Sequence, residues 1–202
     1  LARSMGVPIR RLILATNENN GLEEFFTTGI YRPRSAADTL ATSSPSMDIS
    51  KASNLERFIW ALLGPEAFVQ RWAELESTGT LDLRDQLPRL GEDFGFVAGT
   101  SSHDDRLKTI RSVKERSGRL IDPHTADGVT VALRTMEPGF PTLVMETAKA
   151  AKFPQTVAEA LGTEPETPAV IADLLAQPQK VETIDNEEAP LRHLIEEQAL
   201  TS

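Results

Sequence analysis

Polar side chains follow three apolar runs of the sequence, and these turns are where the chain could carry chemistry. Residues 16–19 follow the first run, residues 122–125 the second and residues 146–149 the third. Ligands of a parallel sheet bind at the carboxyl ends of its strands, where the following turns gather. We therefore expect the hydroxyl, amide, imidazole and carboxyl groups of these turns to meet in one polar site on an apolar scaffold.

The residue inventory excludes several other kinds of site. The chain has no cysteine, so disulfides, thiol nucleophiles and thiolate metal sites are ruled out. Its three histidines, His103, His124 and His193, lie far apart in the sequence and show no metal-ligand spacing. No glycine-rich phosphate loop and no supported Ser-His-Asp motif occurs. Metal and nucleophilic catalysis are therefore not expected from this chain.

Each polar turn also has an ordinary structural explanation. Residues 122–125 look like a helix start with a capping Asp or Thr, which would leave His124 exposed. Residues 146–147 fit a strand end with an ordinary hydroxyl hydrogen bond, and residues 43–48 fit a surface loop. Arg57 has the position of a solvated charge on a helix. The functional interpretation therefore needs support beyond the pattern.

The hydrophobic pattern around these turns predicts an α/β fold, a parallel sheet flanked by helices. Residues 11–16 are predicted to form a strand buried on both faces, residues 21–28 a helix and residues 30–54 a long loop. A mostly helical region follows. Its helices are expected over 55–63, 66–76 and 81–90, and in a helix that Asp104 caps and Gly118 ends.

The alternation of strand and helix then returns, which indicates that the last part of the chain completes the sheet. Leu191, Leu194 and Ile195 of a terminal helix are expected to point inward. The predicted elements are strands at 119–121 and 142–145, helices at 129–136, 153–161 and 168–175, an edge strand at 180–184 and a terminal helix that starts at Asp185.

We expect three regions: a strand-helix unit with an active-site loop at 1–54, a helical region at 55–118 and an αβ segment with C-terminal helices at 119–202. Residues 1–6 look like the last turns of a helix that Gly6 ends. A natural protein would not usually open inside an element, so the sequence is expected to be part of a longer polypeptide.

Charge and composition bear on partners. The formal net charge of -9 is spread over 202 residues without a basic cluster, which argues against nucleic acid as a partner. No apolar run approaches the ~20 residues of a membrane span, and no secretion signal opens the chain. A cytoplasmic protein with no membrane partner is expected.

Five segments together resemble threonine synthase in their order and spacing, and the extended form looks closest to enzymes of the actinobacterial kind. The resemblance runs from Leu1 to about Leu161. The five segments are Leu-Ala-Thr-Asn-Glu-Asn at 14–19, Ser-Pro-Ser-Met-Asp-Ile at 44–49, Ser-Asn-Leu-Glu-Arg at 53–57, Ile-Asp-Pro-His-Thr-Ala at 121–126 and Glu-Thr-Ala-Lys-Ala-Ala-Lys-Phe at 146–153.

The resemblance implies a fold and a reaction. The family has the fold type II (tryptophan synthase β-like) architecture of pyridoxal 5'-phosphate enzymes, with a helical insertion here. Its members convert O-phospho-L-homoserine and water into L-threonine and phosphate by γ-elimination and β-addition, as carbon-oxygen lyases acting on phosphate. In the family, the cofactor lysine and the phosphate loop lie upstream of the matched segments. The upstream part of the same polypeptide is thus an expected partner, and this piece alone is expected to be inactive.

The resemblance also implies site residues. Thr147 stands where the family places a group that faces the pyridine nitrogen of the cofactor, and His124 and Thr125 are expected to border the same cavity. Four further residues are expected to form or support the substrate pocket, namely Ser46, Asp48, Asn54 and Arg57. Where the family commonly has His-Pro, this chain has Lys149 and Ala150, which puts any role of that histidine in doubt.

Two alternatives stay open at this point. The chain could be a non-catalytic binding or regulatory module on an enzyme-like scaffold, or part of another fold type II lyase acting on serine or threonine. A cofactor lysine and a glycine-rich loop encoded before Leu1 would favour the synthase. Their absence from the gene would favour the module.

Overall fold

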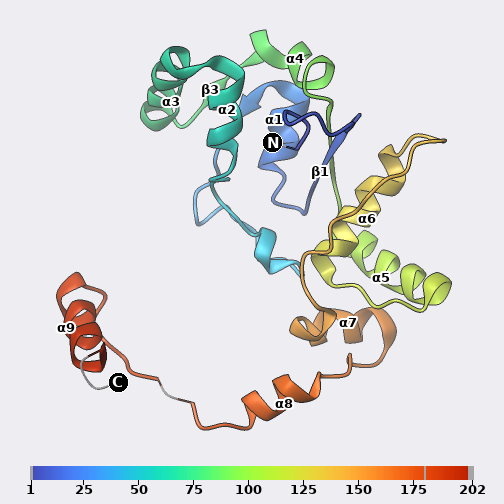
Figure 1. Cartoon of the computed structure of the whole chain (residues 1–202), viewed down its shortest axis with the longest axis vertical. Helices are drawn as coiled ribbons and strands as arrows, with labels where there is room; N and C mark the ends of the chain where they lie inside the picture. Colours follow the sequence, from blue (N-terminus) through green and yellow to red (C-terminus); the bar gives the residue numbers. More distant parts are fainter. Residues whose placement is uncertain (1, 180, 200–202) are drawn as a thin grey trace. The chain divides into compact units, whose positions relative to one another are not determined.

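The computed structural model describes residues 2–179 and 181–199, which divide into two compact units. The first unit comprises Leu1–Glu166 and the second comprises Thr167–Ser202. Figure 1 shows both, and each is described here by itself. The division into 1–54, 55–118 and 119–202 stays a prediction.

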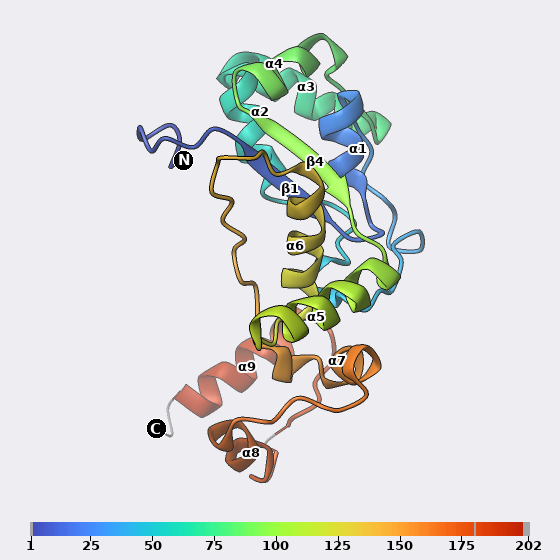
Figure 2. The same ribbon diagram turned by 90° about the vertical axis from the view of Figure 1, so that its right-hand side faces the viewer.

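A parallel strand pair lies at the centre of the first unit (Figure 2). Strand β1 (Leu12–Thr16) pairs with β4 (Phe96–Thr100), in a register that runs from Leu12 opposite Phe96 to Thr16 opposite Thr100. The strand predicted at 11–16 is thus confirmed. Strand β4 was not predicted, because it follows a helical region directly and has only five residues.

Two predicted strands are wrong for the part of the chain that the structure describes. Residues 119–121 are irregular, because the chain there runs straight into the Asp122 cap of the next helix. Residues 142–145 are extended but form no ladder, and Leu143 and Met145 are 88% and 81% exposed. A strand needs a partner for its backbone groups, and this segment has none among the described residues.

Helices cover both faces of the strand pair. Helix α1 (Gly21–Thr28) packs on the face that carries Phe96, whose ring lies 4.3 Å from that of Phe26. Helix α6 (Pro123–Thr135) packs on the other face, where a Cβ on Gly99 would lie 2.9 Å from Cγ1 of Val131. Glycine in β4 is what lets α6 approach this closely.

Helix α6 is longer than the sequence pattern predicted. It begins at Pro123 and not at 129, because the carboxylate of Asp122 accepts a hydrogen bond from the backbone N–H of His124. The capping interpretation of this turn is therefore confirmed for Asp122. The expectation that His124 is exposed is wrong, since only 3% of it is accessible.

The helical region packs over one end of the pair around its own core. The elements are β2 (Ile30–Tyr31), α2 (Leu55–Leu63), α3 (Pro65–Thr78), β3 (Leu81–Asp82), η2 (Arg84–Gln86) and α4 (Leu87–Glu92). Strands β2 and β3 are antiparallel. The helix expected at 81–90 is therefore only partly right, since the α-helix starts at Leu87. Leu81 and Leu83 are fully buried, with Leu81 opposite Tyr31 and the N–H of Leu83 bonded to the carbonyl of Gly29.

Helices α5 (His103–Ser117) and α7 (Pro154–Leu161) pack together beside α6, with η3 (Ala150–Lys152) before α7. The cap of α5 is Ser102 and not the predicted Asp104, because Ser102 forms a reciprocal capping box with Asp105. A Ser hydroxyl and a carboxylate three residues later satisfy two backbone donors at once. Gly118 ends the helix as predicted.

The second unit holds α8 (Ala169–Leu175) and α9 (Glu188–Ala199). The predicted inward position is wrong for two residues of the terminal helix, since Leu191 and Ile195 are 48% and 57% exposed, while Leu194 is half-buried. Residues 181–184 form no strand, and Lys180 lies outside the described residues, as does Leu1. Residues 2–6 form turns where the end of a helix was expected.

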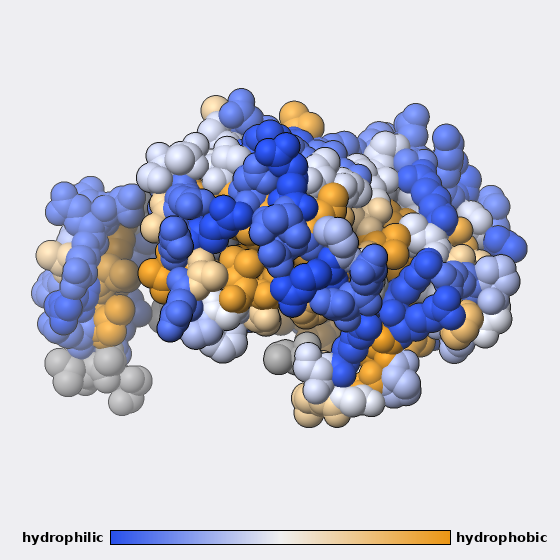
Figure 3. All heavy atoms as spheres, turned by 90° about the horizontal axis from the view of Figure 1, so that it is seen from above, coloured by the Kyte–Doolittle hydropathy of each residue, from blue (hydrophilic) through white to orange (hydrophobic). Residues whose placement is uncertain are grey.

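The surface agrees with the acidic, polar composition. Figure 3 shows a face on which hydrophilic side chains predominate and hydrophobic ones appear between them. Within 2–179 and 181–199, no helix is both long and apolar enough to cross a membrane. The same residues contain no group of three or more potential metal ligands.

Candidate functional site

A cavity of about 320 Å³ lies between α6, β1 and the extended segment 142–147. Its walls are mostly apolar, and its polar groups include His124 and Thr147. The remaining lining residues are Ile13, Ala15, Met47, Gly128, Ala132, Thr142, Leu143, Val144 and Met145. A mostly apolar hollow with a few placed polar groups is typical of a site for a small organic ligand.

The carboxylate of Asp122 organises one edge of this cavity. Its Oδ1 accepts from the backbone N–H of His124 at 3.0 Å and from Nδ1 of His124 at 2.8 Å. Its Oδ2 accepts from the hydroxyl of Thr125 and from the backbone N–H of Ala148 at 3.2 Å. Burial alone would raise the pKa of Asp122, but the hydrogen bonds from His124, Thr125 and Ala148 outweigh it and hold that pKa below its ordinary value.

His124 is held in one protonation state by its two neighbours. The backbone N–H of Ser46 donates to Nε2 of His124 at 2.9 Å, so that nitrogen must carry a lone pair. The proton of the ring then lies on Nδ1, which donates to Asp122. The ring also packs edge-on against Phe153, with centroids 4.7 Å apart. His124 therefore presents a neutral ring to the cavity.

Thr147 lies at the open side of the cavity. Its backbone N–H donates to the hydroxyl oxygen of Thr125 at 3.0 Å, and its own side chain is exposed. Thr125 itself is buried and lines neither of the two cavities described in this section. The structure thus brings His124 and Thr147 to one cavity and places Thr125 behind them as a support.

A second, smaller cavity of about 150 Å³ adjoins the first, because Ala15 and Met47 line both. Asn17 and Ser46 line the second. The first turn of the predicted site therefore neighbours the other two but borders a hollow of its own. Further lining residues are Thr16, Asn19, Gly21, Leu22, Tyr31, Ile49, Ser50 and Ala52.

Asp48 holds the wall of this second cavity together. Its Oδ1 accepts from the side-chain amides of Asn17 and Asn19 at 2.8 and 2.9 Å and from the hydroxyl of Thr42 at 2.7 Å. Its Oδ2 accepts from the backbone N–H of Thr42 at 2.8 Å. The carboxylate of Asp48 is therefore already engaged by protein groups, and it supports the pocket wall.

Two predicted substrate residues lie elsewhere. Asn54 precedes α2 at an exposed position and makes no side-chain capping bond. Arg57 is exposed on α2, and neither residue lines either cavity. The structure does not bring these two side chains to the site formed by His124 and Thr147.

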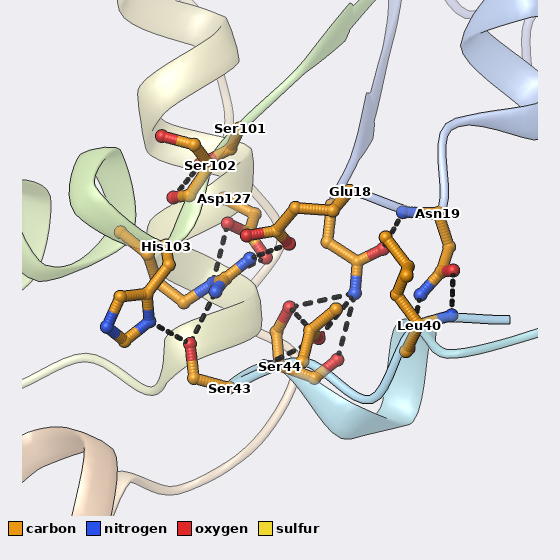
Figure 4. A network of polar contacts seen from close by, with 12 residues as sticks. Glu18, Asn19, Leu40, Ser43, Ser44, Ser101, Ser102, His103 and Asp127 are labelled. Carbon is orange, nitrogen blue, oxygen red and sulfur yellow. Dashed lines mark hydrogen bonds and ion pairs between the residues drawn. The ribbon is translucent and has the colours of Figure 1, made fainter.

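A buried ionic network next to the site was missed by the sequence interpretation. Nε of Arg106 donates to both carboxylate oxygens of Asp127, at 2.9 and 3.1 Å, and both side chains are fully buried. The guanidinium also donates to Ser43 and pairs with Glu18 at 2.9 Å. Figure 4 shows Glu18, Ser43 and Asp127 converging at its centre.

The two carboxylates of this network differ in burial, since the side chain of Asp127 is fully buried and that of Glu18 is 27% exposed. Burial raises the pKa of Asp127, opposed by the charge of Arg106 and by hydrogen bonds from Ser101 and Ser44. The sequence signal for this pair was weak, because an arginine near the start of an amphipathic helix normally faces water.

Lys149 stands where the resembled family commonly has histidine. Its Nζ pairs with Glu146 at 2.9 Å, and its side chain is 80% exposed. It lines neither cavity. Lys149 therefore does not help to position Thr147 and His124, which are held by the contacts of Asp122 and Thr125.

Solved structures share this fold. A crystal structure described as pyridoxal-phosphate-bound threonine synthase from Brucella melitensis matches with a TM-score of 0.84 and 36% identity, over 97% of this chain and 41% of that chain. This match gives the chain the α/β fold that is found in fold type II pyridoxal-phosphate enzymes.

Sequence comparison narrows the class. Proteins named threonine synthase from Methylobacillus glycogenes and Corynebacterium glutamicum are each 48% identical to this chain, over 98% and 100% of it. The chain spans 42% and 43% of the length of these relatives. The family model for the C-terminal part of threonine synthase matches residues 125–195. The chain belongs to the threonine synthase family, whose C-terminal portion it matches.

Proposed function

We propose that this chain acts as the C-terminal part of a threonine synthase, a lyase that converts O-phospho-L-homoserine and water into L-threonine and phosphate with pyridoxal 5'-phosphate. The observation that carries the proposal is the cavity between α6 and β1, where an exposed Thr147 hydroxyl and a neutral His124 ring meet apolar walls. It is supported by relatives of that name at 48% identity.

The residues at the cavity fit one wall of a site for this cofactor. The apolar lining from Ile13, Ala15 and Val144 suits an aromatic ring, and Thr147 offers it a neutral hydroxyl. Within the described part of the chain, no carboxylate lines the cavity. Bound there, pyridoxal phosphate would supply an electron sink for carbanions. A neutral partner at its ring nitrogen leaves that nitrogen largely unprotonated and so moderates the sink.

The remaining residues act by holding this wall. Asp122 and Thr125 fix the backbone of Thr147. The backbone N–H of Ser46 donates a hydrogen bond to Nε2 of His124 and so orients the ring. The apolar walls exclude water from the bound ring. Among the residues that the structure describes, no lysine lines either cavity, and in this proposal the lysine that carries the cofactor comes from another part of the polypeptide. Substrate contacts by Ser46, Asp48, Asn54 and Arg57 belong to the proposal as well, most directly for Ser46, which lines a cavity.

The test is a product assay on the longer polypeptide that contains this chain. Incubated with O-phospho-L-homoserine and pyridoxal phosphate, it should release L-threonine and phosphate in equal amounts. This chain by itself should release neither. Keto acid from L-threonine or L-serine without threonine formation would identify another lyase. If the longer polypeptide converts none of O-phospho-L-homoserine, L-threonine and L-serine, the result supports the non-catalytic binding or regulatory module.

A further inference from the structure

One buried carboxylate contacts two segments of the chain that line the cavity, the start of α6 and the end of the extended segment 142–147. Asp122 is fully buried, and its two oxygens serve different elements. Oδ1 receives two hydrogen bonds from His124 on α6. Oδ2 receives the hydroxyl of Thr125 and the backbone N–H of Ala148 in the extended segment. The proposed function uses this residue only to fix the backbone of Thr147, through the hydroxyl of Thr125.

The first branch leads through His124 to the 45–47 turn. Nδ1 of His124 carries the ring proton and donates a hydrogen bond to Asp122. Nε2 therefore has a lone pair that accepts a hydrogen bond from the backbone N–H of Ser46 at 2.9 Å. Ser46 lines the second cavity and its neighbour Met47 lines both. The carboxylate thereby fixes this turn through the tautomer of the ring.

The second branch leads through Thr125 to Thr147. The Thr125 hydroxyl proton is committed to Asp122, so its oxygen accepts the N–H of Thr147 at 3.0 Å. Residues 141–147 form no ladder with another described strand, and most of their side chains are exposed. These contacts and the Ala148 bond are therefore what holds the end of the segment against α6.

We infer that Asp122 is a positioning residue of this site: its carboxylate sets the direction of the Thr147 hydroxyl and the tautomer of His124 together. The inference rests on the proposed function for its catalytic consequence. It assigns to one side chain the coupling of the two segments that carry His124 and Thr147, and it requires a group that only accepts hydrogen bonds. Four donors converge on Asp122, which an ionised carboxylate satisfies in full.

An asparagine at this position cannot satisfy the same donors in either orientation. With its amide nitrogen toward Thr125, it meets the N–H of Ala148 with a second donor. With its amide nitrogen toward His124, it opposes both the backbone N–H and Nδ1–H of that residue. The ring would then move its proton to Nε2, which faces the N–H of Ser46. A buried donor left without an acceptor is costly, so the wall must shift.

The experiment uses the longer polypeptide that contains this chain, with Asp122→Asn, Thr125→Val and Thr125→Ser. Imidazole ¹⁵N shifts of the cofactor-free protein report the tautomer, and the His124 signal is the one that His124→Gln loses. Asp122→Asn should displace that signal and lower kcat about 10- to 100-fold. Thr125→Val should lower kcat while leaving the His124 signal in place, and Thr125→Ser should restore kcat.

The matched control is Asp105→Asn, an equal change of charge at the start of α5 that lines neither cavity. Asp105→Asn should leave the position of the His124 signal unchanged, and its kcat should lie within twofold of wild type. The inference is overturned if Asp122→Asn keeps both the wild-type tautomer of His124 and the wild-type kcat. If Asp122→Asn does not fold, an unchanged kcat in Thr125→Val still overturns the part of the inference that concerns Thr147. Failure of the proposed function would instead appear as a wild-type protein without threonine formation, whatever the tautomer.

Discussion

The side-chain amide of Asn17 donates to the carboxylate of Asp48 at 2.8 Å, and this contact ties the turn after β1 to the 40–48 loop. Asn17 is fully buried. Its amide also donates to Thr42 at 2.9 Å and to the Ser44 hydroxyl at 3.1 Å. The loop that follows α1 is therefore held by polar groups and not by an apolar core of its own.

Asp48→Ala should loosen this loop. The change removes the acceptor for Asn17, Asn19 and Thr42, and unsatisfied buried donors cost about 1 to 3 kcal/mol. Limited proteolysis should cut within 40–48 faster than in wild type. Asp38→Ala is the control, because Asp38 bonds only to nearby Ser35 at an exposed position. Equal cleavage rates for Asp48→Ala and wild type would refute a structural role of Asp48.

The sequence predicted elements well where the signal was local. Strand β1, helix α2 and the glycine that ends α5 follow from hydrophobic spacing and backbone preference. Strand β4 depends on pairing with β1, some eighty residues away, and five residues carry no such information. The apolar run 142–145 shows the reverse error, since its composition favours a strand but it finds no partner in the described part of the chain.

The site was predictable in its turns but not in its connections. His124 and Thr147 were expected to meet, and the structure brings both to one cavity. Asp122 caps α6 and also binds the His124 ring and the N–H of Ala148. The sequence could not reveal the second function, because an aspartate before a helix is already explained by capping. Arg57 was expected at the substrate pocket, yet it is exposed, whereas Arg106, which the sequence interpretation did not single out, is buried. Which arginine turns inward depends on the helices that α5 packs against.

Arg106→Met should destabilise the protein strongly. Asp127 would keep a fully buried carboxylate without its partner, and breaking a buried pair in this way costs about 3 to 5 kcal/mol. Urea unfolding should show a lower midpoint at an unchanged slope. The double variant Arg106→Met with Asp127→Leu should recover most of the loss, since no charge is left buried. A double variant as unstable as the single one would show that the pair stabilises the fold in itself.

Thr147→Ala should impair cofactor function and leave the fold intact. The hydroxyl is exposed at the cavity, while the contacts that hold the segment use the backbone N–H groups of Thr147 and Ala148. In the longer polypeptide we expect weaker pyridoxal phosphate binding and kcat lowered about tenfold, the loss of one hydrogen bond to a developing charge. Thr147→Ser should retain most of the activity. Unchanged kinetics and unchanged cofactor binding in Thr147→Ala would remove this residue from the site.

Asp105 gives the first unit a pH dependence of known sign. Hydrogen bonds from Ser102 and Arg134 lower the pKa of its carboxyl to about 2. A group whose folded pKa lies below its unfolded value of about 3.9 stabilises the fold above that value, and the contribution disappears as the pH falls through the folded pKa. The variant Asp105→Asn should therefore have a lower free energy of unfolding than wild type at neutral pH, by a constant margin.

This margin in the free energy of unfolding should shrink as the pH falls from about 4 to about 2, because the wild-type carboxyl then takes up its proton. Urea midpoints of the two proteins across this range give the measurement, with raised salt weakening the Arg134 part of the effect. A margin that stays constant down to the lowest pH would show that the carboxylate charge of Asp105 contributes nothing to the capping box.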